Sequence, residues 1–355
     1  MCCTIISNNI NSPTEIIENK LMKKLLFGAV VLSFMSACNS DNMSNQNENP
    51  ANEEITSADL SKRGCASEEV RQEALKNNAQ LRQNFVTLEA NTEKFANELK
   101  LGKVLADGTV EIPVVVNVLY KTTAENVSDA KIAEQIAVLN ADFTGTNADA
   151  SKIPAEFQTV SAGDTKVKFR LVNTIRKATS KTSWATNDDM KKASKGGIDA
   201  TSPANYLNIW VVGKMTSQGR TILGYATFPE SAGLWNDGVA IAAPYFGKTG
   251  AASPFNLGRT ATHEVGHYLN LRHIWGDASC GNDQVTDTPT QTTANYGKPT
   301  YPLYNTCSGV QRSVMFMNYM DYVDDAAMFM FSAGQKTRVQ SVIASTGARS
   351  GLRLY

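Results

Sequence analysis

The chain has no excess of charge of either sign. It carries 34 Lys and Arg residues against 34 Asp and Glu residues, so its formal net charge is zero. This balance excludes the overall basic excess with which proteins attract nucleic acid. We therefore expect no nucleic-acid partner and interpret the lysine-rich stretch 166–195 as a solvated surface. The sequence also has no internal repeat, and we expect a monomer.

Long apolar runs are missing as well. The apolar run Leu25–Met35 is too short to span a bilayer as a helix. It follows Met22-Lys23-Lys24 and therefore suits the central region of a signal peptide. The small residues directly before Cys38 resemble a bacterial lipobox, which predicts lipidation of Cys38 and a lipid anchor in a bacterial membrane. The alternative is a simple secretory signal with an incidental cysteine.

Histidine is scarce, and all 3 histidines fall in the motif HEVGHYLNLRH. On a helix, His263 and His267 project from one face, where two neutral imidazoles can bind one zinc ion. Glu264 stands beside them as a possible general base. His273 can reach the same metal only if the helix stops and the chain turns back, and Asn270 tolerates the left-handed backbone that such a turn needs. The alternative is three ordinary helix-surface or core histidines.

The motif resembles the metzincin zinc-endopeptidase signature HExxHxxGxxH. Within that clan, Ile274–Asp277 and the surrounding segments look most like the pappalysin (M43) family. The resemblance extends upstream to Ile112–Tyr120 and downstream through Met317–Tyr322, so it covers about the C-terminal two-thirds of the chain. The family has Gly at the position of Asn270, and Asn can adopt the same backbone at some conformational cost.

The resemblance implies a role for each matching residue. The three histidines would be the zinc ligands and would leave the fourth position to water or substrate. Glu264 would polarise the zinc-bound water that attacks the peptide bond, and would then pass a proton to the leaving amine. Met320 would form the Met-turn below the metal, and Tyr322 would steady the tetrahedral transition state. For Met320 and Tyr322 the alternative is core packing.

The cysteines divide into groups. Of the 6, two lie in the leader before Met22. Cys280 and Cys307 flank a loop after the motif and are predicted to form a disulfide in an oxidising compartment, with two free thiols as the alternative. Cys65 remains, close to Arg63. Pappalysin-like zymogens resemble this arrangement, and a thiolate is a good zinc ligand, so Cys65 is a candidate cysteine switch.

Two acidic segments are open to different interpretations. The loop Asp283–Pro289 is rich in oxygen ligands, which hard cations prefer. Relatives in the family carry calcium in this region, so Asp283 and Asp287 are candidate ligands of a structural Ca²⁺. The alternative is an Asx-type turn without metal. The pair Asp324-Asp325 would, on a further interpretation, line the substrate's S1′ pocket and favour basic side chains.

The predicted fold class is α+β and metzincin-like. We expect a mixed, mostly parallel twisted sheet with a backing helix and an active-site helix, then an irregular C-terminal subdomain that ends in a helix. The residue pattern predicts strands at 112–120, 167–174, 207–212 and 239–243, and helices at 128–143, 260–271 and 334–344.

Four segments are expected along the chain. Residues 1–37 are a leader and lipoprotein signal peptide, with the true translation start at Met22. Residues 38–57 form a disordered tether because they are too polar to bury a core. Residues 58–107 form a helical pro-segment, and 108–355 form the catalytic domain.

These features predict a zinc metalloendopeptidase that is made as a lipid-anchored or secreted zymogen and acts on proteins or peptides. It would reside at the cell envelope, in the outer membrane or at the cell surface, or be secreted after processing. The alternative is a lipid-anchored surface binding protein with a non-catalytic zinc site. Structural zinc sites usually close with four protein ligands, whereas three histidines leave one position open, which favours the enzyme.

Overall fold

The computed structural model describes residues 62–101 and 108–353. All of them belong to one unit, Glu54–Tyr355. The predicted start at Met22, the signal peptide, the lipidation site Cys38 and the tether lie outside the described residues and stay predictions. Within the described part of the chain, no helix combines the length and apolar character needed to cross a membrane.

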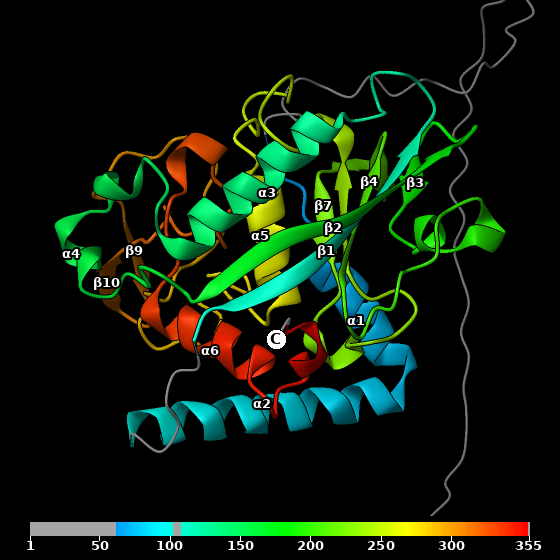
Figure 1. The fold of residues 1–355 in the computed structure, drawn as a ribbon. Coiled ribbons are helices and arrows are strands. Elements are labelled where there is room, and N and C mark those ends of the chain that lie inside the picture. Colours follow the sequence, from blue (N-terminus) through cyan, green and yellow to red (C-terminus); the bar gives the residue numbers. More distant parts are fainter. Residues whose placement is uncertain (1–61, 102–107, 354–355) are drawn as a thin grey trace, which may run out of the picture. The chain divides into compact units, whose positions relative to one another are not determined.

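A five-stranded sheet forms the centre of the fold (Figure 1). Its strands are β1 (Val110–Tyr120), β2 (Val167–Ala178), β4 (Leu207–Val212), β7 (Gly224–Ala226) and β8 (Val239–Ala242). Their order is β2-β1-β4-β8-β7. All neighbours run parallel except β7, which pairs antiparallel with β8. The mixed, mostly parallel sheet predicted from the sequence is therefore confirmed.

The two faces of the sheet pack into two apolar clusters. Along β1, Val114, Val116 and Val118 point into the larger cluster, whereas Leu119 belongs to the smaller one on the other face. Side chains alternate between the faces of a strand, so a nearly continuous apolar run such as 112–120 fits a strand with a core on each face. Trp210 of β4 is fully buried in the smaller cluster.

Two helices cover one face of the sheet. Helix α3 (Asp129–Thr144) packs on β2 and on helix α5 (Arg259–Tyr268), and α5 also packs on β7 and β8. The side chain of Ser128 accepts a hydrogen bond from the Lys131 amide at 3.2 Å and caps the start of α3. These are the predicted backing helix and active-site helix.

The predicted pro-segment helix is divided in two. Helix α1 (Ser67–Asn77) and helix α2 (Ala79–Lys100) meet at Asn78, whose extended backbone ends α1. The Asn78 side chain accepts hydrogen bonds from the amides of Gln80 and Leu81 at 2.9 and 3.2 Å, which starts α2. Helix α2 packs on the C-terminal helix α6 (Ala333–Ile343).

The C-terminal part is irregular before it ends in α6, as predicted. A complete capping box between Ser332 and Gln335 starts α6. The remaining elements are a small sheet of β3 (Trp184–Ala185), β5 (Met215–Ser217) and β6 (Arg220–Ile222), the hairpin of β9 (Tyr304–Cys307) and β10 (Val310–Ser313), helix α4 (Ala155–Gln158), and the short helices η1 (Ala150–Lys152), η2 (Asp189–Lys191), η3 (Ala193–Lys195), η4 (Pro229–Ser231), η5 (Ala243–Tyr245), η6 (Asp325–Ala327) and η7 (Ser350–Leu352).

Candidate metal centre and active site

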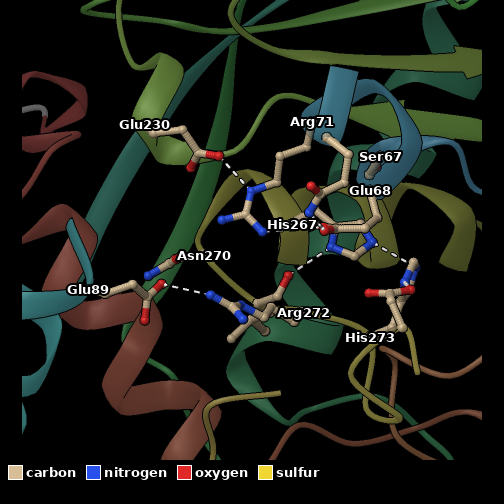
Figure 2. Close-up of polar contacts among 12 residues, drawn as sticks. Ser67, Glu68, Arg71, Glu89, Glu230, His267, Asn270, Arg272 and His273 are labelled. Carbon is tan, nitrogen blue, oxygen red and sulfur yellow. Dashed lines mark hydrogen bonds and ion pairs between the residues drawn. The ribbon is translucent and has the colours of Figure 1, made fainter. Parts of the chain in front are cut away.

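The three histidines of the motif meet in space. His263 and His267 lie on α5, and Asn270 adopts a φ of 73° directly after the helix. This left-handed residue turns the chain back, as predicted, and brings Nε2 of His273 to 3.1 Å from Nε2 of His267 (Figure 2). Cys65 joins them, since ligand atoms of all four side chains lie within 4.8 Å of one another.

Each histidine is oriented through its other ring nitrogen. Nδ1 of His263 lies 2.7 Å from the Tyr319 carbonyl oxygen, and Nδ1 of His267 lies 2.7 Å from the Leu271 carbonyl oxygen. Carbonyl oxygens only accept hydrogen bonds, so both Nδ1 atoms must carry the proton. Burial lowers the pKa of both rings well below its usual value, so both are neutral and present a lone pair at Nε2.

These lone pairs fit a cation. Nε2 of His263 is buried and has no hydrogen-bond partner among the residues that the structure describes, and Nε2 of His267 faces Nε2 of His273 at 3.1 Å. Nδ1 of His273 lies 2.5 Å from a carboxylate oxygen of Asp277, which only accepts, so Nε2 of this ring also offers a lone pair when the ring is neutral. Lone pairs that face one another repel, whereas a shared zinc ion would satisfy all three.

Glu264 lies beside the histidine cluster. It is buried, and burial raises its pKa to about 7. Its Oε2 accepts a hydrogen bond from the Ser67 hydroxyl at 2.7 Å. Gly224 of β7 leaves room for this side chain, because a Cβ at that position would lie 2.7 Å from Cγ of Glu264. A carboxylate at this place can take up and release a proton next to the metal position.

Met320 and Tyr322 both lie near the histidine cluster. Met320 is fully buried, and its Sδ lies directly against Gly266 in α5, where no Cβ would fit. The ring of Tyr322 lies 5.7 Å from that of His263 and 4.9 Å from that of His273, measured between centroids. The structure thus brings both predicted residues to the site.

The segment before α1, which the sequence predicts to be part of a pro-segment, enters the same site. Cys65 forms a parallel bridge with Gly224 on the edge strand β7. Two residues earlier, the Arg63 side chain is buried and donates a hydrogen bond to Asp325 at 2.6 Å. Its guanidinium also lies 4.8 Å from the Phe255 ring centroid, so Arg63 fills an acidic, aromatic pocket next to the metal position. Of the predicted acidic pair, Asp325 is the member that contacts it.

Sequence reasoning missed two contributors to the site. One is Asp277, the carboxylate that faces His273. It lies four residues after this histidine in the sequence, and this short spacing could have indicated the contact. Ser67, which donates to Glu264, carries no signal of its own, because hydroxyls near a helix start are common caps. Its hydroxyl also accepts a hydrogen bond from the Ala226 amide of β7 at 2.8 Å.

The two candidate calcium ligands bind protein groups. Asp283 accepts hydrogen bonds from the Val285 amide at 3.1 Å and the Thr288 hydroxyl at 2.8 Å, which is an Asx-type turn, and burial raises its pKa to about 6. Asp287 accepts from the Ser332 hydroxyl at 2.6 Å and the Gly334 amide at 2.7 Å, at the start of α6. Calcium binding stays a prediction.

The predicted disulfide between Cys280 and Cys307 is present in the structure. The two Cα atoms lie 5.6 Å apart across a sequence separation of 27. The bond joins the segment just after the histidine motif to strand β9, and so fixes the irregular chain that follows the metal position.

The family model for peptidase M43, described as pregnancy-associated plasma protein-A, matches residues 192–344. An extracellular metalloprotease of Verticillium alfalfae is 33% identical over 259 residues, which cover 69% of this chain and 80% of the relative. Mature mirolysin of Tannerella forsythia in complex with a cleaved peptide is 40% identical, with a TM-score of 0.66, over 70% of this chain and 97% of that one. A promirolysin mutant of the same organism is 38% identical, with a TM-score of 0.72, over 82% of this chain and 98% of that one.

The metzincin-like fold, the histidine motif and these relatives agree. The chain belongs to the peptidase M43 (pappalysin) family of zinc metalloproteases, which hydrolyse peptide bonds.

Proposed function

We propose that the chain is a zinc-dependent endopeptidase in which His263, His267 and His273 hold the metal and Glu264 is the general base and acid. The convergence of three imidazole lone pairs beside one buried carboxylate carries this proposal. Zinc bound there would polarise the peptide carbonyl and activate water. Among the described residues 108–353, no fourth His, Cys, Asp or Glu ligand joins the three histidines, unlike in a purely structural zinc site.

The protein groups around the metal position suit peptide hydrolysis. Glu264 takes a proton from the attacking water and later gives it to the leaving amine. Tyr322 lies beside two of the histidine rings, from where its phenol would donate a hydrogen bond to the developing oxyanion. Met320 packs against α5 through its contact with Gly266, and so acts on the position of the ligands only.

We further propose that residues 58–107 make the chain a zymogen. Cys65 would supply the fourth ligand and so exclude water, and the Ser67 hydroxyl donates a hydrogen bond to Glu264 that would hold the carboxylate away from substrate. The promirolysin likeness over 82% of this chain, against 70% for mature mirolysin, supports a pro-segment of this extent. The Cys65→Ala variant should show peptidase activity before any cleavage of the chain, and latency equal to the parent's would refute the thiol's role.

The pocket of Arg63 suggests the substrate class. We propose that a basic side chain next to the scissile bond takes the place of Arg63 against Asp325 and Phe255. The test uses two peptides that differ only at that position, where one has Arg and the other has citrulline. Citrulline has nearly the same shape as Arg but no charge, so the pair isolates the effect of the positive charge. We expect at least tenfold faster cleavage of the Arg peptide, because a buried carboxylate without a cationic partner is costly. Equal rates would contradict this preference.

The location of the protein is the last part of the proposal. Relatives named extracellular metalloproteases and the Cys280–Cys307 disulfide both support export. We propose that Cys38 carries a lipid anchor. Bacteria that produce the parent chain or the Cys38→Ala variant are grown with a labelled fatty acid. The parent chain should become labelled, whereas the Cys38→Ala variant should remain unlabelled. A label on both chains, or on neither, would contradict lipidation at Cys38.

Peptide cleavage tests the central proposal. The full chain is first digested until helices α1 and α2 are degraded, and is then incubated with a peptide library, with and without a chelator. We expect cleavage that chelation abolishes and zinc restores, and a loss of at least a hundredfold in Glu264→Gln. Glu111→Gln, which removes a surface carboxylate paired with Arg170, is the matched control and should cleave like the parent. Zinc binding without any cleavage would instead favour a surface binding protein.

A further inference from the structure

Helix α2 contacts the body through a polar surface separate from the Arg63 and Cys65 contacts. The body residues are Glu230 of η4, Asn270 and Arg272 of the histidine motif, and Arg338 and Ser341 of α6, which we call the α2-docking surface. Figure 2 shows Glu89 of α2 beside Arg272 and Asn270. The surface therefore includes the turn that carries the third histidine.

The central contact is a two-pronged ion pair. Nη2 and Nη1 of Arg338 donate to the two carboxylate oxygens of Glu89 at 2.8 and 3.1 Å. Nη2 of Arg272 lies 3.4 Å from the same carboxylate. The side chains are mostly buried, with exposed fractions of 7% for Arg338, 18% for Arg272 and 22% for Glu89. Paired, partly desolvated arginine–carboxylate contacts are among the stronger polar interactions in proteins.

Weaker polar and apolar contacts surround this pair along one face of α2. Thr92 Oγ1 accepts from Asn270 Nδ2 at 3.4 Å and from Ser341 Oγ at 3.2 Å, and Asn84 Nδ2 donates to the Glu230 carbonyl at 3.1 Å. Buried apolar positions on the same helix face are Leu81 and Leu88. Residues 81, 84, 88, 89 and 92 recur at helical spacing. The whole face is therefore complementary to the body.

The two arginines of the body need an anion. In the described ranges, Glu89 is the carboxylate that forms ion pairs with Arg272 and Arg338. Burial alone would raise the pKa of Glu89, but the hydrogen bonds and charges of the arginines outweigh it and lower the pKa. Without α2, both guanidinium groups would lose the carboxylate with which they form ion pairs, which is unfavourable in a partly desolvated surface.

We propose that the α2-docking surface holds the pro-segment on the body after the backbone is cut between α2 and β1, so that the cut pro-segment remains a noncovalent inhibitor. This inference rests on the proposed zymogen. It adds that a cut alone does not activate the enzyme. Release then requires high salt, dilution or degradation of the helices, because partly exposed ion pairs are screened by salt.

The experiment uses the full chain with a recognition sequence for a site-specific protease inserted between Leu101 and Gly108. The Cys65→Ala background removes the thiol contact from every sample. After cleavage, gel filtration at several dilutions measures the dissociation constant of the two fragments. We expect the fragments to elute together. Glu89→Gln should raise the dissociation constant at least tenfold, and Glu93→Gln, an exposed carboxylate on the same helix, should change it less than twofold.

The outcomes distinguish an error in this inference from an error in the proposed function. Fragments that elute apart in the Cys65→Ala background would overturn the inference, because the thiol would then have been the main attachment. An unchanged dissociation constant in Glu89→Gln would also overturn it. Both test substitutions lie in the pro-segment, so the body keeps its sequence. Co-elution does not depend on catalysis, so a chain that cleaves no peptide would refute the proposed function and leave this test intact.

Discussion

Asp277 should control how tightly the third histidine holds zinc. His273 is the one proposed ligand outside α5, and its Nδ1 donates to Asp277 at 2.5 Å, whereas the other two histidines donate to backbone carbonyls. The ring is also stacked on Trp275, with centroids 4.4 Å apart. A carboxylate behind a ligand histidine fixes the ring and raises its basicity.

The size of the effect follows from the contact. Loss of such a partner costs about 10- to 100-fold in metal affinity, or about 1.4–2.8 kcal/mol. Asp277 has a φ of 54°, so the replacements must tolerate a left-handed backbone. Asn and Gly both do. Asp277→Asn keeps an acceptor oxygen and should lie at the weak end of this range, and Asp277→Gly should lie at the strong end.

The assay is competition for zinc with a chromophoric chelator in the Cys65→Ala background, so that the three imidazoles alone are measured. Asp164→Asn, a surface carboxylate paired with Lys166, is the control and should bind like the parent. Affinities of both Asp277 variants within twofold of the control would refute the reasoning. Unfolding curves of the same samples report whether either variant has lost its fold.

Three further predictions concern single positions. Asn270→Gly should raise the free energy of unfolding by about 1 kcal/mol, because it relieves a φ of 73° and removes a buried oxygen without a partner, whereas Asn270→Ala should lower it, as denaturant titration can measure. Gly224→Ala should cut the peptide cleavage rate 10- to 100-fold with unchanged zinc affinity, because its Cβ would displace Glu264, and unchanged cleavage would contradict this. The Glu89–Arg338 contact lowers the pKa of Glu89 in the folded state below its ordinary value of 4.5. The contact therefore stabilises the fold fully above pH 4.5, and this stabilisation is lost as the pH falls through the pKa of Glu89 in the folded state. The difference in unfolding free energy between the parent and Glu89→Gln should thus be constant from pH 7 to about 5 and shrink in more acidic solution, and a difference that grows with acid would refute it.

Features that depend on local rules were predictable from the sequence. The one-turn spacing of His263 and His267 and the left-handed turn at Asn270 follow from helix geometry and side-chain sterics. The strand at 112–120 and the helix at 128–143 were recognisable from an apolar run and a serine cap. The structure has them as β1 and α3, with bounds that differ by one or two residues.

Features that depend on distant partners were not predictable. Glu89 and Arg338 are separated by 249 positions and Arg63 and Asp325 by 262, and neither pair has a spacing that indicates contact. Strand β7 has three residues and includes Gly224, so it lacks the alternation that identifies strands. The break at Asn78 between α1 and α2 was missed because the residues on both sides of Asn77-Asn78 have high helix propensity.

The three described cysteines must exist in two oxidation states within one protein. Cys280 and Cys307 are joined, whereas Cys65 is a free thiol in the same chain. Thiol–disulfide exchange requires an attacking sulfur that can reach its target. Cys65 is held against Ser67, Glu264 and the edge of β7, so docking of the proposed pro-segment would protect the pairing of the other two sulfurs during oxidative folding.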